Sequence, residues 1–279
     1  EVHSHRPGWW VQGPAGAGLE TPGRWRFLAD RSVRPNTEDA FHSARQYLGA
    51  LDRVEAGLRP GGWTNIDFDD RTWAPVVPAG PPTASEGWGL APLRRLVPRG
   101  LPALEETAQV FPRLWQRRRP EVLPWRVAAE ERGELWLDAG GLTTSYPVLE
   151  FEGGAGREVR VVYAEALGHW RSSGGVRFWV KSGRRDDVAT LDPHGYHDAL
   201  VLPGGRFVFE PFHWRTFWFV KLEVLPGPEP VVLSRATHRF TSFPHVFDAT
   251  FTCDHPGIGR LWETSVRTLW LCAHETYED

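Results

Sequence analysis

The sequence predicts a mainly β protein, built as a sandwich or jelly roll and followed by one helix. Three observations favour this fold class. Residues 134–252 hold about eight strand-like segments separated by short turns, at the spacing of an all-β sandwich. Fifteen tryptophans and 15 phenylalanines supply the large apolar side chains that such cores bury, so most tryptophans are expected in the core. A helical pattern begins only near residue 256.

Length and charge narrow the class of protein. The 279 residues suffice for two domains, or for one large β unit with additions. The formal charge of −3 argues against the polyanion-binding surface of a nucleic-acid binder. No apolar run is long enough to span a membrane, so neither nucleic acid nor membrane is an expected partner.

The cysteines and the lack of methionine bear on the cellular location of the protein and on whether the sequence includes its natural N-terminus. Cys253 and Cys272 flank and occupy the same predicted helix, so we expect buried free thiols rather than a disulfide. Unpaired thiols slightly favour a cytoplasmic location. The sequence has no methionine, even at position 1, so we expect a missing natural N-terminus and leave localisation unknown.

The first hundred residues predict a β domain with weak strands. Short apolar runs at Trp9–Gln12 and Arg24–Leu28 are interrupted by proline and glycine. In 62–77, GWTNIDFDDRTWAPVV, aromatic residues surround turn-forming aspartates (Trp63, Phe68 and Trp73; Asp67, Asp69 and Asp70). This pattern indicates a surface loop held by aromatic rings; the alternative is a loop that binds calcium or sugar hydroxyls. Residues 78–106, rich in proline, predict a connection between domains whose arginines are solvated or paired with Glu105 and Glu106.

Regular strands are predicted from Glu134 onward. Glu134–Asp138 alternates, and Gly140–Gly141 is expected to end that strand before Tyr146–Glu152 resumes. A turn at 153–156 and a returning strand at Arg157–Glu165 predict a hairpin. The glycine cluster is not a phosphate loop, because the next element is a strand and no Gly-Lys-Ser/Thr follows.

The longest predicted strand is Trp214–Leu225. Its alternation places Trp218, Val220, Leu222 and Val224 on one face, with Phe217 and Phe219 on the other, as in a sandwich. Val231–Phe240 and Val246–Thr252 are two further predicted strands. Between these blocks lies a Pro/Gly loop with two histidines and two aspartates: Asp192, His194, His197 and Asp198. We expect the histidines to face solvent and predict no metal; the alternative is a zinc site.

The last segment predicts an amphipathic helix that would open a larger helical domain. Asp254 is the expected cap and Pro256 lies in the first turn. One face is expected to be buried: Ile258, Leu261, Trp262, Ser265, Leu269, Cys272 and Ala273. Without a partner, Leu261, Trp262 and Leu269 would be exposed. On a continuing helix Glu275 and Asp279 share a face, either as paired carboxylates or as a solvated end.

The order of these blocks resembles the bacterial α-L-rhamnosidases of glycoside hydrolase family 78. The blocks are GWTNIDFDDRTW, LAPLRRLVPRGLPALEE, ELWLDAGGLTTSYPVLEFEGGAGREVRVVYAEAL, FEPFHWRTFWFVKLEV and TFTCDHPGIGRLWETSVRTLWLCAHETYED. The resemblance implies an accessory jelly-roll domain at 1–106, a concanavalin-like β-sandwich at 107–245, and the first helix of an (α/α)6 catalytic barrel at 246–279. It therefore implies an N-terminal fragment of the enzyme.

The resemblance also implies a reaction, the inverting hydrolysis of terminal α-L-rhamnosides by the complete parent. That reaction needs two carboxyl groups roughly 6.5–9.5 Å apart. In the family the general acid and base follow this segment, so no catalytic residue is expected here and the fragment is expected to be inactive alone. Asp279 falls on an aspartate that contacts the sugar, and is the one expected substrate-binding residue.

The expected partner is a rhamnose-containing glycoside or polysaccharide, with no cofactor and an open oligomeric state. Two alternatives remain. One is a non-catalytic carbohydrate-binding or structural β-sandwich protein. The other is a related hydrolase that acts on a different sugar.

Overall fold

The computed structural model describes residues 11, 13–21, 23–37, 51–78, 99–181 and 183–278, without the side chain of Arg177. Its contacts divide the chain into two compact units. The first comprises Glu1–Asp30 and Pro60–Leu101, and the second comprises Arg31–Arg59 and Pro102–Asp279. The domain limits expected from the sequence stay predictions, but residues 31–59 share the contacts of the second unit.

The described part of the first unit contains one small antiparallel sheet, β1 (Arg26–Phe27) with β4 (Ala74–Pro75). The rings of Phe68 and Trp73 meet edge to face, 5.4 Å apart, as expected of a loop held by aromatic residues. The carboxylate of Asp69 is occupied by Arg71, with 2.6 Å between Oδ2 and Nη2. No group of three His, Cys, Asp or Glu side chains that could hold a metal ion occurs among the described residues, and the jelly-roll assignment stays a prediction.

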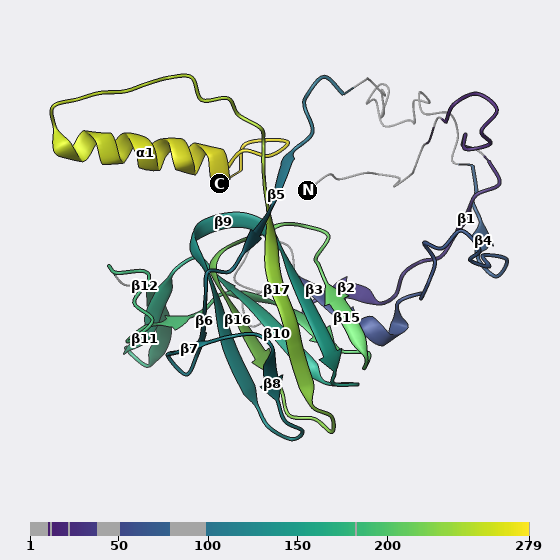
Figure 1. The fold of residues 1–279 in the computed structure, drawn as a ribbon, viewed down its shortest axis with the longest axis horizontal. Helices are drawn as coiled ribbons and strands as arrows, with labels where there is room; N and C mark the ends of the chain where they lie inside the picture. Colours follow the sequence, from purple (N-terminus) through teal and green to yellow (C-terminus); the bar gives the residue numbers. More distant parts are fainter. Residues whose placement is uncertain are drawn as a thin grey trace. The chain divides into compact units, whose positions relative to one another are not determined.

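The second unit is mainly β, which confirms the predicted fold class (Figure 1). Its strands in chain order are β2 (Val33–Pro35), β3 (Asp52–Glu55), β5 (Glu105–Val110), β6 (Arg113–Gln116), β7 (Arg119–Glu121), β8 (Trp125–Val127), β9 (Gly133–Gly153), β10 (Glu158–Ala164), β11 (Leu167–Ser173), β12 (Val176–Lys181), β13 (Asp192–Pro193), β14 (Tyr196–Val201), β15 (Arg206–Phe209), β16 (Arg215–Val224) and β17 (Val231–Ser242). A short 3-10 helix, η2 (Ala56–Leu58), follows β3, and one α-helix, α1 (Pro256–Leu271), follows β17.

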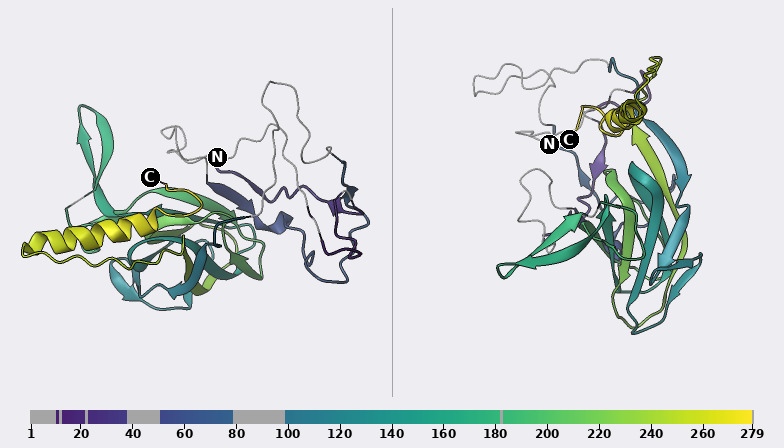
Figure 2. Two further views of the ribbon diagram at one scale, coloured as in Figure 1. Left: turned by 90° about the horizontal axis from the view of Figure 1, so that it is seen from above. Right: turned by 90° about the vertical axis from the view of Figure 1, so that its left-hand side faces the viewer.

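The central sheet has the order β2-β3-β14-β10-β16-β9-β17-β5. The long strand β9 links its two halves, because its first half pairs with β16 and its second half with β17 and β15. The sheet curls at β9, so that the strands face one another across an apolar interior as in a sandwich (Figures 1 and 2). Fully buried side chains such as Leu135, Phe151, Val161 and Leu222 form this core.

Two predictions around β9 are wrong. Gly140 and Gly141 do not end the strand, which continues from Gly133 to Gly153, with Gly140 at a φ of 79° that only glycine adopts easily. The hairpin with the following strand does not form either. Near its end β9 is already paired on both sides, since Glu152 lies opposite both Arg206 and Val232. No free edge remains, so β10 pairs with β14 and β16 instead.

Strand β16 contains an irregularity that changes its predicted faces. Its pairing with β9 shifts register between Phe217 and Phe219. Phe217 therefore joins Val220 and Leu222 in the main core, whereas Phe219 packs in a second cluster with Ala164, Leu167 and Leu191, with the half-buried Trp218 against it. Simple alternation fails here because the pairing is interrupted: the single residue Trp218 of β16 stands opposite residues 139–142 of β9.

The segment before α1 also differs from expectation. Residues 246–252 form no strand, and Val246 is 89% exposed. The helix cap is His255 rather than Asp254, because the amide of Gly257 donates to His255 Nδ1 over 3.2 Å. Proline at the first helical position is confirmed.

Tryptophan and cysteine are less buried than predicted. Among the tryptophans that the structure describes, only Trp125 and Trp136 are fully buried, while phenylalanine and aliphatic side chains fill the core. Both cysteines are free, but Cys253 is exposed and Cys272 half-buried. The flat indoles mostly border the sandwich, where one edge of the ring stays in contact with water.

Candidate functional site

The sequence places its candidate residues at the C-terminus, where the end of α1 and the loop Cys272–Glu278 meet the end of β17. We call this region the C-terminal junction. The hydroxyl of Ser242 donates to the carbonyl oxygens of Trp270, at 2.6 Å, and Ala273, at 3.1 Å. The amide of Phe243 donates to the same Ala273 oxygen over 2.7 Å. These bonds satisfy carbonyls that the helix end leaves open.

A stacked pair of a histidine and a tryptophan connects the junction to the sandwich. The imidazole of His274 lies flat on the indole of Trp214, with ring centroids 4.0 Å apart and planes 8° apart. His274 Nε2 lies 3.1 Å from the carbonyl oxygen of Thr241, and its Nδ1 has no partner among the described residues. Burial lowers the pKa of His274, against opposing effects of Glu278 and the Thr241 carbonyl, so the ring is neutral near pH 7.

The last turn of α1 has its own contacts with the sheet. Trp270 Nε1 donates to Glu105 Oε1 over 2.8 Å, and its ring meets Phe240 edge to face. Arg267 Nη2 donates to the carbonyl oxygen of Leu142 over 2.7 Å. Between helix and sheet lies a cavity of about 150 Å³, lined by Gln109, Ala139, Gly140, Gly141, Thr143, Phe240, Arg267 and Trp270. The α-helix is thus held to the sandwich by its C-terminal turn.

The acidic residues of the junction are arranged differently from the prediction. The helix ends at Leu271, so Glu275 does not lie on a continuing helix and the expected shared face is wrong. The chain turns back instead: the amide of Glu278 donates to the Cys272 carbonyl over 2.8 Å, and Ala273 pairs with Tyr277. Glu275 and Glu278 are exposed. Asp279, the predicted substrate-binding residue, lies outside the described residues.

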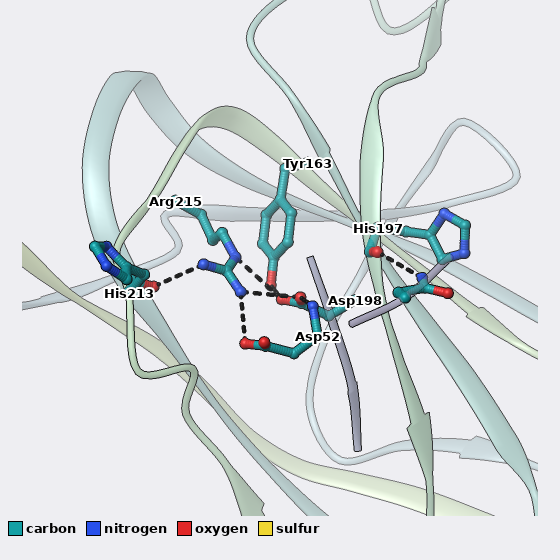
Figure 3. Close-up of polar contacts among 7 residues, drawn as sticks. Asp52, Tyr163, His197, Asp198, His213 and Arg215 are labelled. Carbon is teal, nitrogen blue, oxygen red and sulfur yellow. Dashed lines mark hydrogen bonds and ion pairs between the residues drawn. The ribbon is translucent and has the colours of Figure 1, made fainter. Parts of the chain in front are cut away.

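A second polar cluster lies inside the sandwich, and the sequence reasoning missed it (Figure 3). Arg215 donates from Nη2 to Asp198 Oδ1 and to Asp52 Oδ2, each over 2.9 Å, and from Nε to Asp198 Oδ2 over 3.2 Å. The Tyr163 hydroxyl donates to Asp198 Oδ2 over 2.6 Å. The amide of Asp52 donates to Asp198 Oδ1 over 2.8 Å. Both oxygens of the Asp198 carboxylate are therefore occupied.

The electrostatics of this cluster follow from burial and mutual charge. Burial raises the pKa of Asp52, and the neighbouring Asp198 carboxylate adds to the effect. Burial also raises the pKa of the Tyr163 phenol well above its usual value, with a further contribution from Asp198. For Arg215 burial acts in the opposite direction, but the carboxylates prevail and its pKa is raised. Asp198 is fully buried, so the cluster connects β3 to β14 and β16 rather than meeting a ligand.

The predicted histidine–aspartate group is dispersed. Asp198 belongs to β14 and points into the cluster above, so its expected place in a Pro/Gly loop is wrong. Asp192 pairs with Arg118, with 2.7 Å between Oδ1 and Nη2. His194 is half-buried against the rings of Trp170 and Trp179, with centroids 4.6 and 5.0 Å away. Within the described residues, no three His, Cys, Asp or Glu side chains come together as metal ligands would.

Comparison with known proteins supports the fold. No protein-family model matches the sequence, and no curated protein matches it. The solved α-L-rhamnosidase from Dictyoglumus thermophilum is similar over 82% of this chain and 22% of its own, with 17% identity and a TM-score of 0.50. A family GH78 rhamnosidase of Bacillus sp. GL1 is similar over 58% of this chain, with 22% identity and a TM-score of 0.42.

The chain spans only 15% of the length of the Bacillus enzyme and 22% of the Dictyoglumus enzyme. At these identities the similarity shows a shared β-rich fold. None of the helices that the structure describes is long and apolar enough to cross a membrane.

Proposed function

We propose that this chain is the N-terminal part of a glycoside hydrolase related to the α-L-rhamnosidases. The observation that carries the proposal is the similarity of fold to the Dictyoglumus α-L-rhamnosidase over 82% of the chain. The five sequence blocks that resemble the same family support it independently. We keep 1–106 as an accessory jelly roll, 107–245 as the concanavalin-like sandwich and 246–279 as the opening of an (α/α)6 barrel.

The surface of α1 supports a continuing helical domain. Its apolar side chains are exposed along the helix: Ile258 by 37%, Leu261 by 60%, Trp262 by 39% and Leu269 by 44%. Among the described residues, the hydrogen bonds and ring contacts between α1 and the sandwich come from Arg267 and Trp270, near its C-terminal end. An amphipathic helix with an uncovered apolar face is a docking surface for further helices. In the proposal, the barrel that follows covers this face.

The proposed position of this chain in the parent enzyme assigns different roles to the β domains and to the barrel. The two carboxyl groups of an inverting hydrolysis lie beyond residue 279, and Asp279 contributes a contact to the sugar. The β domains support the barrel and help to shape the entrance for a terminal α-L-rhamnoside. The isolated chain is accordingly proposed to be inactive.

The first experiment is to sequence the coding DNA past the Asp279 codon. We expect it to continue into Cys-Pro, then an acidic residue and Gly-Asp, and the complete protein to hydrolyse an aryl α-L-rhamnoside. In that protein Asp279→Asn lowers turnover strongly, while Glu275→Gln, the matched carboxylate in the exposed turn, has a smaller effect. A stop codon directly after Asp279 would overturn the proposal.

A stop codon would favour the second candidate, a non-catalytic carbohydrate-binding protein. The observation behind this candidate is the set of exposed aromatic rings on the strands β11 and β12, where Trp170 is 39% and Phe178 42% exposed. The glycan would bind the chain without being cleaved. Electrophoresis through a gel that contains a rhamnose-bearing polysaccharide tests it, and unretarded migration counts against it.

A further inference from the structure

The hairpin of β11 and β12 extends away from the sandwich as a narrow arm (Figure 2). We call residues 167–185 the hairpin arm. Its strands pair antiparallel from Gly168–Lys181 to Ser173–Val176, so Trp170 lies directly opposite Trp179. The two indoles meet edge to face with centroids 5.8 Å apart. Nearer the tip, Phe178 and Val176 are 42% and 64% exposed.

The charge of the arm is opposite to that of the whole chain. The whole chain has a net charge of −3, whereas the arm contains no Asp or Glu. The arm carries five cations: Arg171, Arg177, Lys181, Arg184 and Arg185. Two of these cations are neutralised by flanking acids, Lys181 by Glu165 at 3.1 Å and Arg184 by Asp186 at 3.5 Å.

Two other cations of the arm keep their charge. Arg171 donates from Nε to His169 Nε2 over 2.8 Å, a neutral partner when the imidazole is unprotonated. Within the described residues, no carboxylate lies within ion-pair distance of Arg171 or Arg185. Both side chains are exposed. Arg171 pairs with the exposed Phe178 across the hairpin, so the arm presents one uncompensated guanidinium group beside an exposed aromatic ring and a second, Arg185, after β12.

This combination selects a particular class of ligand. Aromatic rings stack on the apolar faces of sugar rings, and guanidinium groups bind carboxylates through paired hydrogen bonds. A neutral glycan has no anionic group that could pair with the guanidinium groups. A nucleic acid carries a charge about every 1.7 Å, which suits a far denser basic surface than a few arginines on an acidic protein. A uronate chain, with at most one carboxylate per sugar, matches the sparse charge of the arm.

We propose that the hairpin arm binds a carboxylate-bearing glycan chain, such as one that contains uronic acids. This inference rests on the proposed function, since it names the substrate class of the parent hydrolase as an acidic, rhamnose-bearing polysaccharide. The arm holds the acidic backbone, and the rhamnose is cleaved elsewhere in the parent.

The test measures binding of the 279-residue chain to polygalacturonate by affinity electrophoresis and calorimetry. Polygalacturonate lacks rhamnose, so the result is independent of the cleaved sugar and of the coding-DNA experiment. Carboxyl-reduced polygalacturonan is the neutral comparison, and single-stranded DNA is the other polyanion. We expect binding to the uronate polymer that weakens with salt, and none to the reduced polymer.

Two variants test the location of the site. Arg171→Glu with Arg185→Glu should weaken binding about tenfold or more, because two charge-assisted contacts become repulsive. Arg132→Glu with Arg260→Glu changes the net charge equally at exposed positions off the arm and should leave affinity within about twofold. Phe178→Ser removes an exposed ring without reversing a charge and should weaken binding as well.

Each other outcome overturns the proposal. Absence of binding to polygalacturonate, or equal binding to the reduced polymer, removes the carboxylate as the recognised group. Equal loss in the Arg132/Arg260 variant shows a general charge effect rather than a site on the arm. Tighter binding to single-stranded DNA replaces the glycan with a nucleic acid. An unchanged thermal midpoint in every variant ensures that lost binding is not lost folding.

Discussion

The imidazole of His274 stacks on the indole of Trp214, with 4.0 Å between ring centroids, and this pair joins the chain after α1 to the strand region of β16. The pair lies beside the hydrogen bond from the Phe243 amide to the Ala273 carbonyl. Docking of the C-terminal junction on the sandwich thus combines this stack with the hydrogen bonds of Ser242 and the contacts of Trp270. Its stability is separable from that of the core.

The first prediction concerns this stack. Trp214→Ala should release the C-terminal junction, because an aromatic pair contributes about 0.5–1.5 kcal/mol beyond the area that it buries. Hydrogen exchange measures the effect: the Phe243 amide should exchange about tenfold faster or more, while the Val161 amide in the core keeps its protection. Trp214→Phe retains a ring and should lie between the two. Equal protection of Phe243 in all three proteins would contradict the docking role.

The second prediction concerns the buried ion pair of Asp198 and Arg215. Arg215→Met leaves the Asp198 carboxylate buried without its cation and should cost about 3–5 kcal/mol of unfolding free energy. Asp52→Asn removes a less buried charge from the same guanidinium and should cost less. The pair of the exposed Arg206 with the half-buried Glu150 is the comparison, where Arg206→Ala should cost no more than about 1 kcal/mol. Urea titration measures all three, and a reversed order would refute this account.

The third prediction concerns acid stability and His238, which is 1% exposed between Phe111 and Phe217. Burial lowers its pKa to about 4, against a small opposing effect of the Val110 carbonyl. In the unfolded chain its pKa is about 6.5, so below that pH the unfolded state binds a proton that the folded state excludes. Stability is therefore complete above pH 6.5 and falls as the pH drops toward 4.

The expected size of this loss is at most about 2.5 kcal/mol at pH 4.5. His238→Gln cannot titrate, so the difference in unfolding free energy between pH 7 and pH 4.5 should be smaller in the variant by about that amount. A variant with the same acid sensitivity as the native chain would exclude His238 as its source.

The fourth prediction concerns the exposed apolar face of α1. Replacing Leu261 and Leu269 together by Lys should raise the concentration at which the chain begins to self-associate, because an uncovered apolar patch promotes aggregation. Light scattering measures this, with Arg260→Ala and Glu263→Ala as exposed controls on the same helix. The thermal midpoint should stay constant, since these side chains do not pack on the sandwich. A lowered midpoint would show instead that this face is buried in solution.

The separate elements were predictable where a local pattern specifies them. The alternation in 134–138, 157–165 and 214–225 predicts the strands observed in β9, β10 and β16, and the three- and four-residue spacing after Pro256 predicts α1. The exposure of Leu261, Trp262 and Leu269 also followed from the sequence. These features depend on residues within one turn or one strand, so neighbours in the chain are sufficient to specify them.

The candidate sites were less predictable, since they depend on residues far apart in the chain. Asp198 follows a Pro/Gly-containing segment, so the sequence predicts a loop. The hydrogen bonds from Arg215, Tyr163 and the Asp52 amide are what make burial of its carboxylate favourable. Likewise, the stack of His274 on Trp214 joins positions with no common pattern. A buried charge becomes visible in a sequence only when its partner is known.

The sequence by itself determined that this chain is mainly β, with one terminal amphipathic helix, because periodicity and turn residues are local properties. The tertiary structure decided which strands pair, and its decision contradicted the expected hairpin. Glu152 near the end of β9 is flanked by β15 and β17, so β10 had to pair with β14 and β16. Whether a strand has a free edge depends on the whole sheet, because a strand that is paired on both sides cannot pair with a third strand.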